Sequence, residues 1–195
     1  SDFGGNFTTD FTSITGNEWD VFFGNSAAGN PNGMVNRVGY PSSEHITQHS
    51  QWAQKVDELL QSDAQIYIEL EPEFNAASNS ITIETTTEIL EPISASLSLN
   101  VILTESHIIA YQTDYDADPQ EIADYEHNHV MRKSFTGSWG LDLGQSGYNN
   151  GDIISNTFSL TVDEDWVVEN MTVVAFVSNT NSYQVIQAEE TYIME

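Results

Sequence analysis

The sequence predicts a mainly β protein, in which residues 64–195 form an antiparallel β-sandwich behind a shorter α/β segment at residues 1–63. The first observation is a change of period, because apolar residues recur every three or four positions before residue 63 and every second position after it. The second is the presence of about seven alternating segments in the longer part. The third is that their connections are rich in Asn, Gly and Ser, which turns select.

Residues 1–63 are expected to hold two helices and a strand. A helix starts near residue 15 and stops at Gly24, alternating residues at 34–40 predict a strand, and the clearest helix spans about residues 47–61. The apolar stripes of the two helices consist of Trp19, Phe22 and Phe23, and of Trp52, Val56, Leu59 and Leu60. A domain boundary is placed at residue 63, giving an α/β domain at 1–63 and a sandwich domain at 64–195.

The second part alternates with the period of half-buried strands. Pro72 is expected to close the first strand, and the connection at residues 113–151 breaks the even spacing. A connection of this length usually carries a function or structure of its own. The predicted strands lie at residues 64–71, 80–89, 95–104, 107–112, 153–162, 171–178 and 183–192. Such a series is typical of an immunoglobulin- or fibronectin-like sandwich.

The charge of the chain excludes one class of partner. Four basic residues stand against thirty acidic ones, which gives a net charge of −26. This surface repels the phosphates of nucleic acids and anionic lipid headgroups, so no nucleic-acid binding is expected. The acidity favours solubility, cation binding or life in a salty medium.

Composition also removes several chemistries. The chain has no cysteine, so it offers no disulfide, thiol nucleophile, zinc–thiolate site or Cys-x-x-Cys redox pair. No apolar run reaches the roughly 20 residues of a membrane span, and no signal peptide opens the sequence. The first residues are expected to be a mature or processed terminus.

Several segments resemble one known family. Residues 125–132 (YEHNHVMR), 135–140 (FTGSWG), 173–177 (VVAFV) and 185–189 (VIQAE) resemble the C-terminal domain of the outer membrane protein 28-related family of Bacteroidota. Residues 31–37 are similar to the cis-proline segment of that family's thioredoxin-like domain, and residues 52–60 to its last helix. The resemblance implies an exported lipoprotein or secreted protein at the outer membrane surface, sometimes with a sorting domain for type IX secretion.

The resemblance implies that residues 1–63 are only the second half of a thioredoxin-like domain. The helix that carries a Cys-x-x-Cys pair in that domain has no counterpart here, so redox activity does not transfer. A half sheet leaves open edges. The chain is therefore expected to be a processed fragment or to be completed by another chain.

An acidic loop is the candidate metal site. Carboxylates at alternate positions are arranged as a loop that wraps Ca²⁺ requires, although Pro119 and Tyr125 exclude an EF-hand. The candidate calcium ligands are Asp114, Asp116, Asp118, Glu121 and Asp124. The alternative, which we favour, is a solvated acidic face.

Two further groups are candidate binding residues. His127 and His129 would share one face of an extended strand, where two imidazoles can hold Zn²⁺ or Cu²⁺, but a structural role in backbone hydrogen bonds is favoured. Trp139 is the third candidate, since Phe135, Trp139 and Tyr148 would make an aromatic platform for carbohydrate. For these three rings the sequence favours the core.

Function is predicted to be binding or structural, because no catalytic constellation is present and no catalytic residue is assigned. The first hypothesis is an exported, adhesion-type protein of the cell surface whose partner is a protein or a cell-surface polymer. The second is the substrate-positioning part of a thioredoxin-like oxidoreductase or chaperone. The third is a self-assembling subunit whose partner is another copy of the chain. Calcium is the one cofactor considered.

Overall fold

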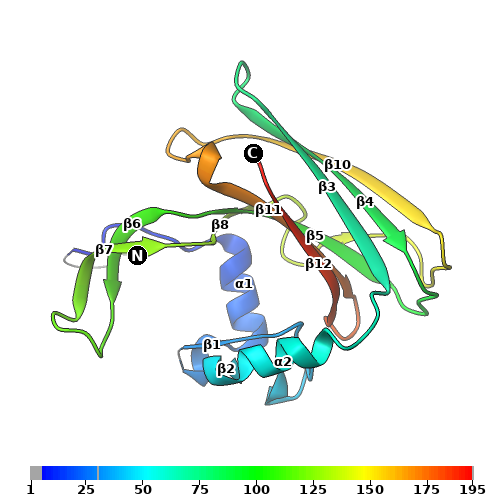
Figure 1. Ribbon diagram of the computed structural model, residues 1–195, viewed down its shortest axis with the longest axis horizontal. Helices are drawn as coiled ribbons and strands as arrows, with labels where there is room; N and C mark the ends of the chain where they lie inside the picture. The colour runs from blue at the N-terminus through cyan, green and yellow to red at the C-terminus, as the bar shows by residue number, and fades with distance from the viewer. Residues whose placement is uncertain (1–5, 30, 195) are drawn as a thin grey trace.

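The computed structural model describes residues 6–29 and 31–194, and two antiparallel sheets dominate it (Figure 1). The smaller sheet has the order β10 (Ile153–Thr161), β4 (Ser80–Ile89), β3 (Ile66–Asn75). The larger has the order β12 (Val185–Tyr192), β11 (Met171–Asn179), β5 (Leu97–Glu105), β8 (Val130–Ser134), and β9 (Leu141–Asp142) also pairs with β5. The predicted mainly β, antiparallel architecture is confirmed, while its immunoglobulin-like character stays a prediction.

The main hydrophobic core lies between these two sheets. Alternate residues of each strand point inward, as the period of two predicted, and the core members are aliphatic almost throughout. The most deeply buried of them are Ile66, Ile68, Ile81, Ile83, Ile89, Leu97, Leu99, Val101, Leu103, Met171, Val173 and Val177. β5 is buried on both faces, so a second layer must cover the outside of the larger sheet.

Strand β3 is longer than predicted. Pro72 was expected to close it, but the strand continues to Asn75, with Pro72 opposite Ile83 of β4. The expectation is wrong because β3 is an edge strand, where the missing N–H of proline removes no ladder hydrogen bond.

The long connection at residues 113–151 carries regular structure. β6 (Ile108–Thr113) pairs with β7 (Glu121–His127), and β8 follows directly in the larger sheet. The β6–β7 hairpin, which we call the arm, projects away from the sandwich on the left of Figure 1. It extends the ribbon that β5 and β8 begin.

A bend separates the arm from the sandwich. His107 and His129 both adopt positive φ, at 60° and 55°, on opposite strands of the ribbon. Their backbone N–H groups are satisfied by side chains, because that of His107 donates to Asn128 Oδ1 at 3.1 Å and that of His129 donates to Ser106 Oγ at 3.1 Å. Both strands therefore contribute to the bend, each with one residue at positive φ whose N–H is hydrogen-bonded by a side chain.

The first helix, α1 (Ile14–Phe23), begins one residue earlier than the sequence indicated. The Ser13 hydroxyl caps it by accepting from the Gly16 N–H at 2.9 Å, and Gly24 ends it at φ 79°. The second helix, α2 (Trp52–Leu59), is shorter than the predicted span of 47–61 because a 3-10 turn precedes it at His49–Gln51. Neither α-helix of the described residues is long and apolar enough to span a membrane.

The predicted strand at residues 34–40 is wrong. The segment is a turn in which Asn36 and Arg37 adopt positive φ, at 50° and 55°, and Gly39 has φ 96°. A Cβ at Gly39 would lie 2.9 Å from Glu44 Cβ, so this close turn requires glycine at position 39. The flanking residues form the short pair β1 (Asn32–Gly33) and β2 (Thr47–Gln48).

The N-terminal segment packs on the outer face of the larger sheet (Figure 1). The Trp19 indole of α1 donates to the Ser138 carbonyl at 2.6 Å and packs on Phe176 of β11 at 5.9 Å between ring centroids. The Val185 N–H of β12 donates to the Asn36 carbonyl at 2.9 Å. The N-terminal segment is therefore the second layer, and it covers the outer face of β5. The thioredoxin-like character that the resemblance implied for residues 1–63 stays a prediction.

Candidate functional site

Aromatic side chains gather where the N-terminal segment meets the loops of the larger sheet. We call Phe22, Tyr40, Trp139 and Tyr183 the aromatic patch. Phe22 is its centre, with ring centroids 4.6 Å from Trp139, 5.0 Å from Tyr183 and 5.4 Å from Tyr40. Phe22 and Trp139 are 38% and 42% exposed, while Phe23 lies buried beneath the patch.

The patch is held in place by four separate parts of the chain. Phe22 comes from the end of α1, Tyr40 from the turn before β2, Trp139 from the β8–β9 loop, and Tyr183 from the β11–β12 loop. Gly140, next to Trp139, has φ 82°, and a Cβ there would lie 2.8 Å from the Asn100 Nδ2. The loop can approach β5 this closely only with glycine. The rings are therefore preorganised.

The prediction for the three candidate aromatics is correct for two of them. Phe135 packs against the core and Tyr148 is buried within it. Trp139, for which the sequence also favoured the core, lies at the surface in the aromatic patch. Trp139 is exposed because β8 ends at Ser134. Beyond that residue, side chains no longer alternate between the two faces of a sheet, so sequence alternation does not predict the direction of Trp139.

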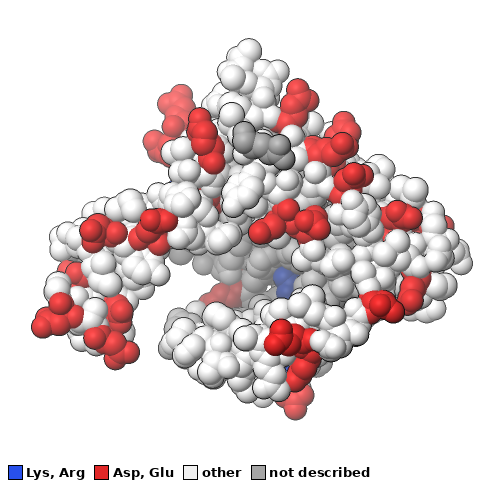
Figure 2. Space-filling model, viewed as in Figure 1, with Lys and Arg blue, Asp and Glu red and all other residues white. Residues whose placement is uncertain are grey.

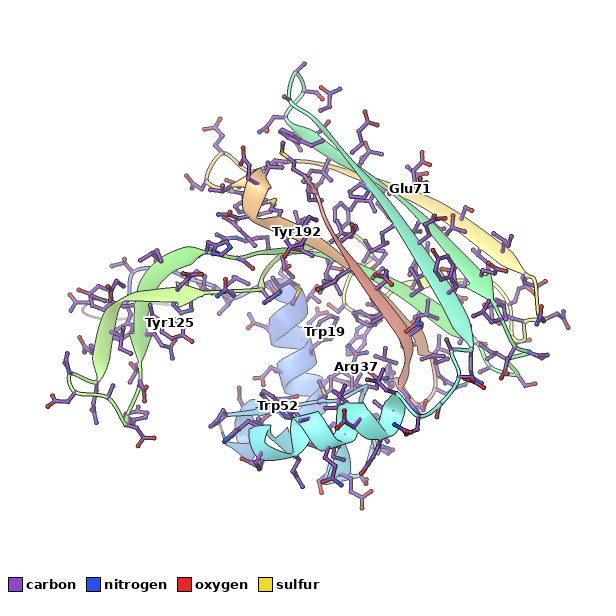
Figure 3. All side chains as sticks on the ribbon, in the orientation of Figure 1. Trp19, Arg37, Trp52, Glu71, Tyr125 and Tyr192 are labelled. Carbon is purple, nitrogen blue, oxygen red and sulfur yellow. The ribbon has the colours of Figure 1, made fainter. Side chains whose placement is uncertain are left out.

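Arg37 lies beneath the N-terminal layer, among three other rings. Its guanidinium carbon is 5.0 Å from the Trp19 ring, 4.8 Å from Phe23 and 5.1 Å from Phe176. Figure 3 shows Trp19 and Arg37 close together between the larger sheet and α2. Cation–π attraction of this kind is worth about 2 kcal/mol or more in a desolvated setting, so Arg37 helps to join the two layers.

The predicted calcium ligands lie on the arm. Asp114, Asp116 and Asp118 belong to the loop between its strands, and Glu121 and Asp124 lie on β7. Asp114 Oδ1 accepts from the Asp116 N–H at 2.9 Å, which is a turn-stabilising contact. Among the residues that the structure describes, no three acidic or histidine side chains are placed to hold a metal ion. Calcium binding stays a prediction from the sequence.

The two candidate histidines are not on one continuous strand. His127 ends β7, where its ring packs on Phe11 at 4.7 Å and Tyr125 at 4.8 Å, and His129 lies in the bend. His127 Nε2 is buried without a hydrogen-bond partner beside a cavity of about 570 Å³ between the arm and residues 6–12. Glu126, the sequence neighbour of His127, makes a hydrogen bond with His107 Nδ1 at 2.7 Å.

Sequence reasoning missed three members of the aromatic patch and the setting of Arg37. One signal was the width of the stripe predicted for the first helix from Trp19, Phe22 and Phe23, because a ring at the edge of such a stripe can stay exposed, as Phe22 does. A second signal was also present: residues 21–43 surround Arg37 and contain no Asp or Glu. In a chain with thirty acidic residues, that gap marks a cation without a nearby partner.

Comparison with known proteins gives one family and several similar structures. Residues 21–195 match the family model described as "Outer membrane protein Omp28". A domain of the outer membrane lipoprotein Omp28 from Porphyromonas gingivalis is 20% identical, with 68% of this chain and 90% of that chain covered and a TM-score of 0.45. Spo0M, a sporulation control protein from Bacillus subtilis, is 12% identical, with coverage of 67% and 47% and a TM-score of 0.41. No curated protein matches the chain.

Proposed function

The chain belongs to the family of outer membrane protein Omp28, and from that premise we propose that it is a binding protein without catalytic activity, which holds a neutral polysaccharide on its aromatic patch. Family membership places the chain outside the cytoplasm, at the outer membrane surface or secreted. Polymers of cells and of their surroundings are the ligands that such a location offers. The half-exposed cluster of rings is the observation that carries the proposal.

The chemistry of the patch fits a sugar ring. Pyranose rings present apolar C–H faces that stack on aromatic rings, while their hydroxyls hydrogen-bond at the rim. Phe22 and Trp139 offer exposed ring surface, and Tyr40 and Tyr183 add phenol groups beside it. Binding would order these side chains little further, because each ring already packs on its neighbours, so the loss of conformational entropy is small.

The negative charge of the molecule favours a neutral polymer over an anionic one. Acidic side chains are scattered over the face shown in Figure 2, with few basic ones among them. A protein with a net charge of −26 would repel a polyanion, whereas a neutral glycan would experience no such repulsion. The proposal therefore excludes uronate-rich and sulfated polymers as tight ligands of the patch.

The test is affinity electrophoresis and calorimetry against neutral polysaccharides, such as laminarin and xyloglucan, with alginate as the anionic comparison. Trp139→Ala should weaken binding to the neutral ligand roughly tenfold or more, a loss of about 1.4 kcal/mol. Tyr67→Ala is the matched control, because Tyr67 is an exposed aromatic residue on β3 of the other sheet.

Circular dichroism should show that both variants keep the wild-type fold. Equal affinity of the two variants would place the binding surface elsewhere. Preference for alginate, or no binding to any neutral polymer, would refute the proposal.

A further inference from the structure

Arg37 is a buried cation that has no acceptor among the residues that the structure describes. The residue is 7% exposed, and within residues 6–29 and 31–194 no hydrogen bond or ion pair joins its guanidinium to another side chain or carbonyl. The contacts it does make, with the rings of Trp19, Phe23 and Phe176, are to π-electrons and leave all five N–H donors unused.

This arrangement is costly in free energy. A buried charge is normally paired, because an unpaired one loses much of its hydration without compensation. The chain holds thirty acidic residues, yet the stretch around Arg37 at residues 21–43 contains none. By contrast Arg132, the other arginine, is paired with Glu105 at 2.8 Å.

The backbone that presents Arg37 is itself strained. Asn36 and Arg37 are consecutive non-glycine residues at φ 50° and 55°, a left-handed conformation that residues with a Cβ adopt infrequently. The Val185 N–H of β12 holds this turn through the Asn36 carbonyl. Strained backbone of this kind persists only where the surrounding structure over-determines it, and it clusters at ligand-binding sites.

The edge of the guanidinium is accessible. None of its nitrogens is among the fully buried polar atoms without a partner, so solvent reaches them. Figure 2 shows a basic group at the base of a hollow in the visible face, and Figure 3 labels Arg37 at that place. Burial lowers the pKa of Arg37 to about 10, so the side chain is still charged at neutral pH.

We propose that Arg37 is an anion-binding site that receives a single carboxylate group of a ligand through the open edge of its guanidinium. The planar fork of arginine matches a carboxylate with two parallel hydrogen bonds. The rings beside Arg37 would border the apolar part of the ligand. A monoanion is preferred to a polyanion because the rest of the molecule is strongly acidic. This site is independent of the polysaccharide on the aromatic patch.

The test is a ¹⁵N NMR titration of the intact chain, in which each arginine contributes one Nε–H signal. The chain has two arginines, so Arg37→Lys and Arg132→Lys assign both signals. Acetate and benzoate are the probes, and sodium chloride at equal ionic strength controls for screening. The Arg37 signal should shift and saturate with either carboxylate, while that of Arg132, already paired, should not move.

Variants and a second anion complete the experiment. Arg37→Lys keeps the charge but loses the fork, so carboxylate affinity should fall roughly tenfold, measured from backbone amide shifts near residue 37. Inorganic phosphate, largely a dianion above pH 7, should bind more weakly than acetate. The proposal is overturned if the wild-type Arg37 signal does not respond, responds equally to chloride, or moves together with that of Arg132, since Arg37 would then be only a structural contact between layers.

Discussion

Glu105 is buried at the end of β5, with 3% of its side chain exposed. Both of its oxygens are used: Oε2 accepts from Arg132 Nε at 2.8 Å, and Oε1 accepts from the Val167 N–H at 3.2 Å. A buried carboxylate in this position depends on its cation, because removing one partner of such a pair leaves the other charge uncompensated.

We therefore predict that Arg132→Met destabilises the protein by about 3–5 kcal/mol, measured by urea unfolding. Lys133→Met is the matched control, since Lys133 is its exposed neighbour, and should change stability by less than about 0.5 kcal/mol. Equal losses in the two variants would show that Glu105 does not need Arg132.

Single residues were the hardest feature to predict. The sequence alone does not identify the partner of Arg132, which is Glu105, 27 positions earlier. The sheet register that brings β5 beside β8 decides this partner, and register is not encoded by alternation alone. The same applies to Trp139, whose exposure depends on where the ladder ends.

The arm is an element that needs support from outside its own strands. An isolated two-stranded hairpin is marginally stable in water. Residues 6–12 run beside it, with Phe7 against Tyr111 at 5.9 Å and Phe11 against His127 at 4.7 Å. The stability of the arm therefore depends on a segment that is distant in sequence.

Phe11→Ala should loosen the arm without unfolding the sandwich. We expect amide hydrogen exchange in β6 and β7 to become roughly tenfold faster or more, which corresponds to about 1.4 kcal/mol of local opening. Exchange in β5 and β11 should stay unchanged. Tyr115→Ala, at the exposed tip of the arm, serves as the control and should leave all four strands as they are. Faster exchange throughout the molecule would mean that Phe11 supports the whole fold.

Elements were predicted well where one period ran without interruption. The aliphatic alternation of β4, β5, β10 and β11 located those strands to within two residues. The pattern failed at residues 34–40, where Met34, Val38 and Tyr40 mimic alternation across a turn with three positive φ angles. It also missed β7 and β8, since β7 is mostly exposed and carries charged side chains on a hairpin that has no core of its own.

The molecule as a whole carries far more negative charge than it can pair. Thirty acidic residues face four basic ones, and among the described residues one arginine or lysine side chain, that of Arg132, forms an ion pair, with Glu105. Some like charges are directly opposed, as Glu71 and Glu84 are across β3 and β4. Repulsion of this kind favours expansion of the chain and is screened by salt.

Stability should consequently rise with ionic strength. Between about 10 mM and 0.5 M NaCl, where the Debye length falls from roughly 30 Å to a few Å, we expect the melting temperature to increase by at least about 3 °C. KCl should act equally, because screening depends on ionic strength and not on the cation. A flat or falling melting curve would show that the acidic side chains are too well spaced to repel each other.

The bend at His107 and His129 has a mechanical consequence. Beyond it the arm continues lengthwise into β5, which pairs along its whole length with β11 from Leu97 to Glu105. A load applied at the tip of the arm therefore enters the sandwich parallel to this ladder, and its hydrogen bonds share the force together instead of opening one after another. Because β5 is an inner strand of the larger sheet, tension on the arm would reach the sandwich through its most buried strand.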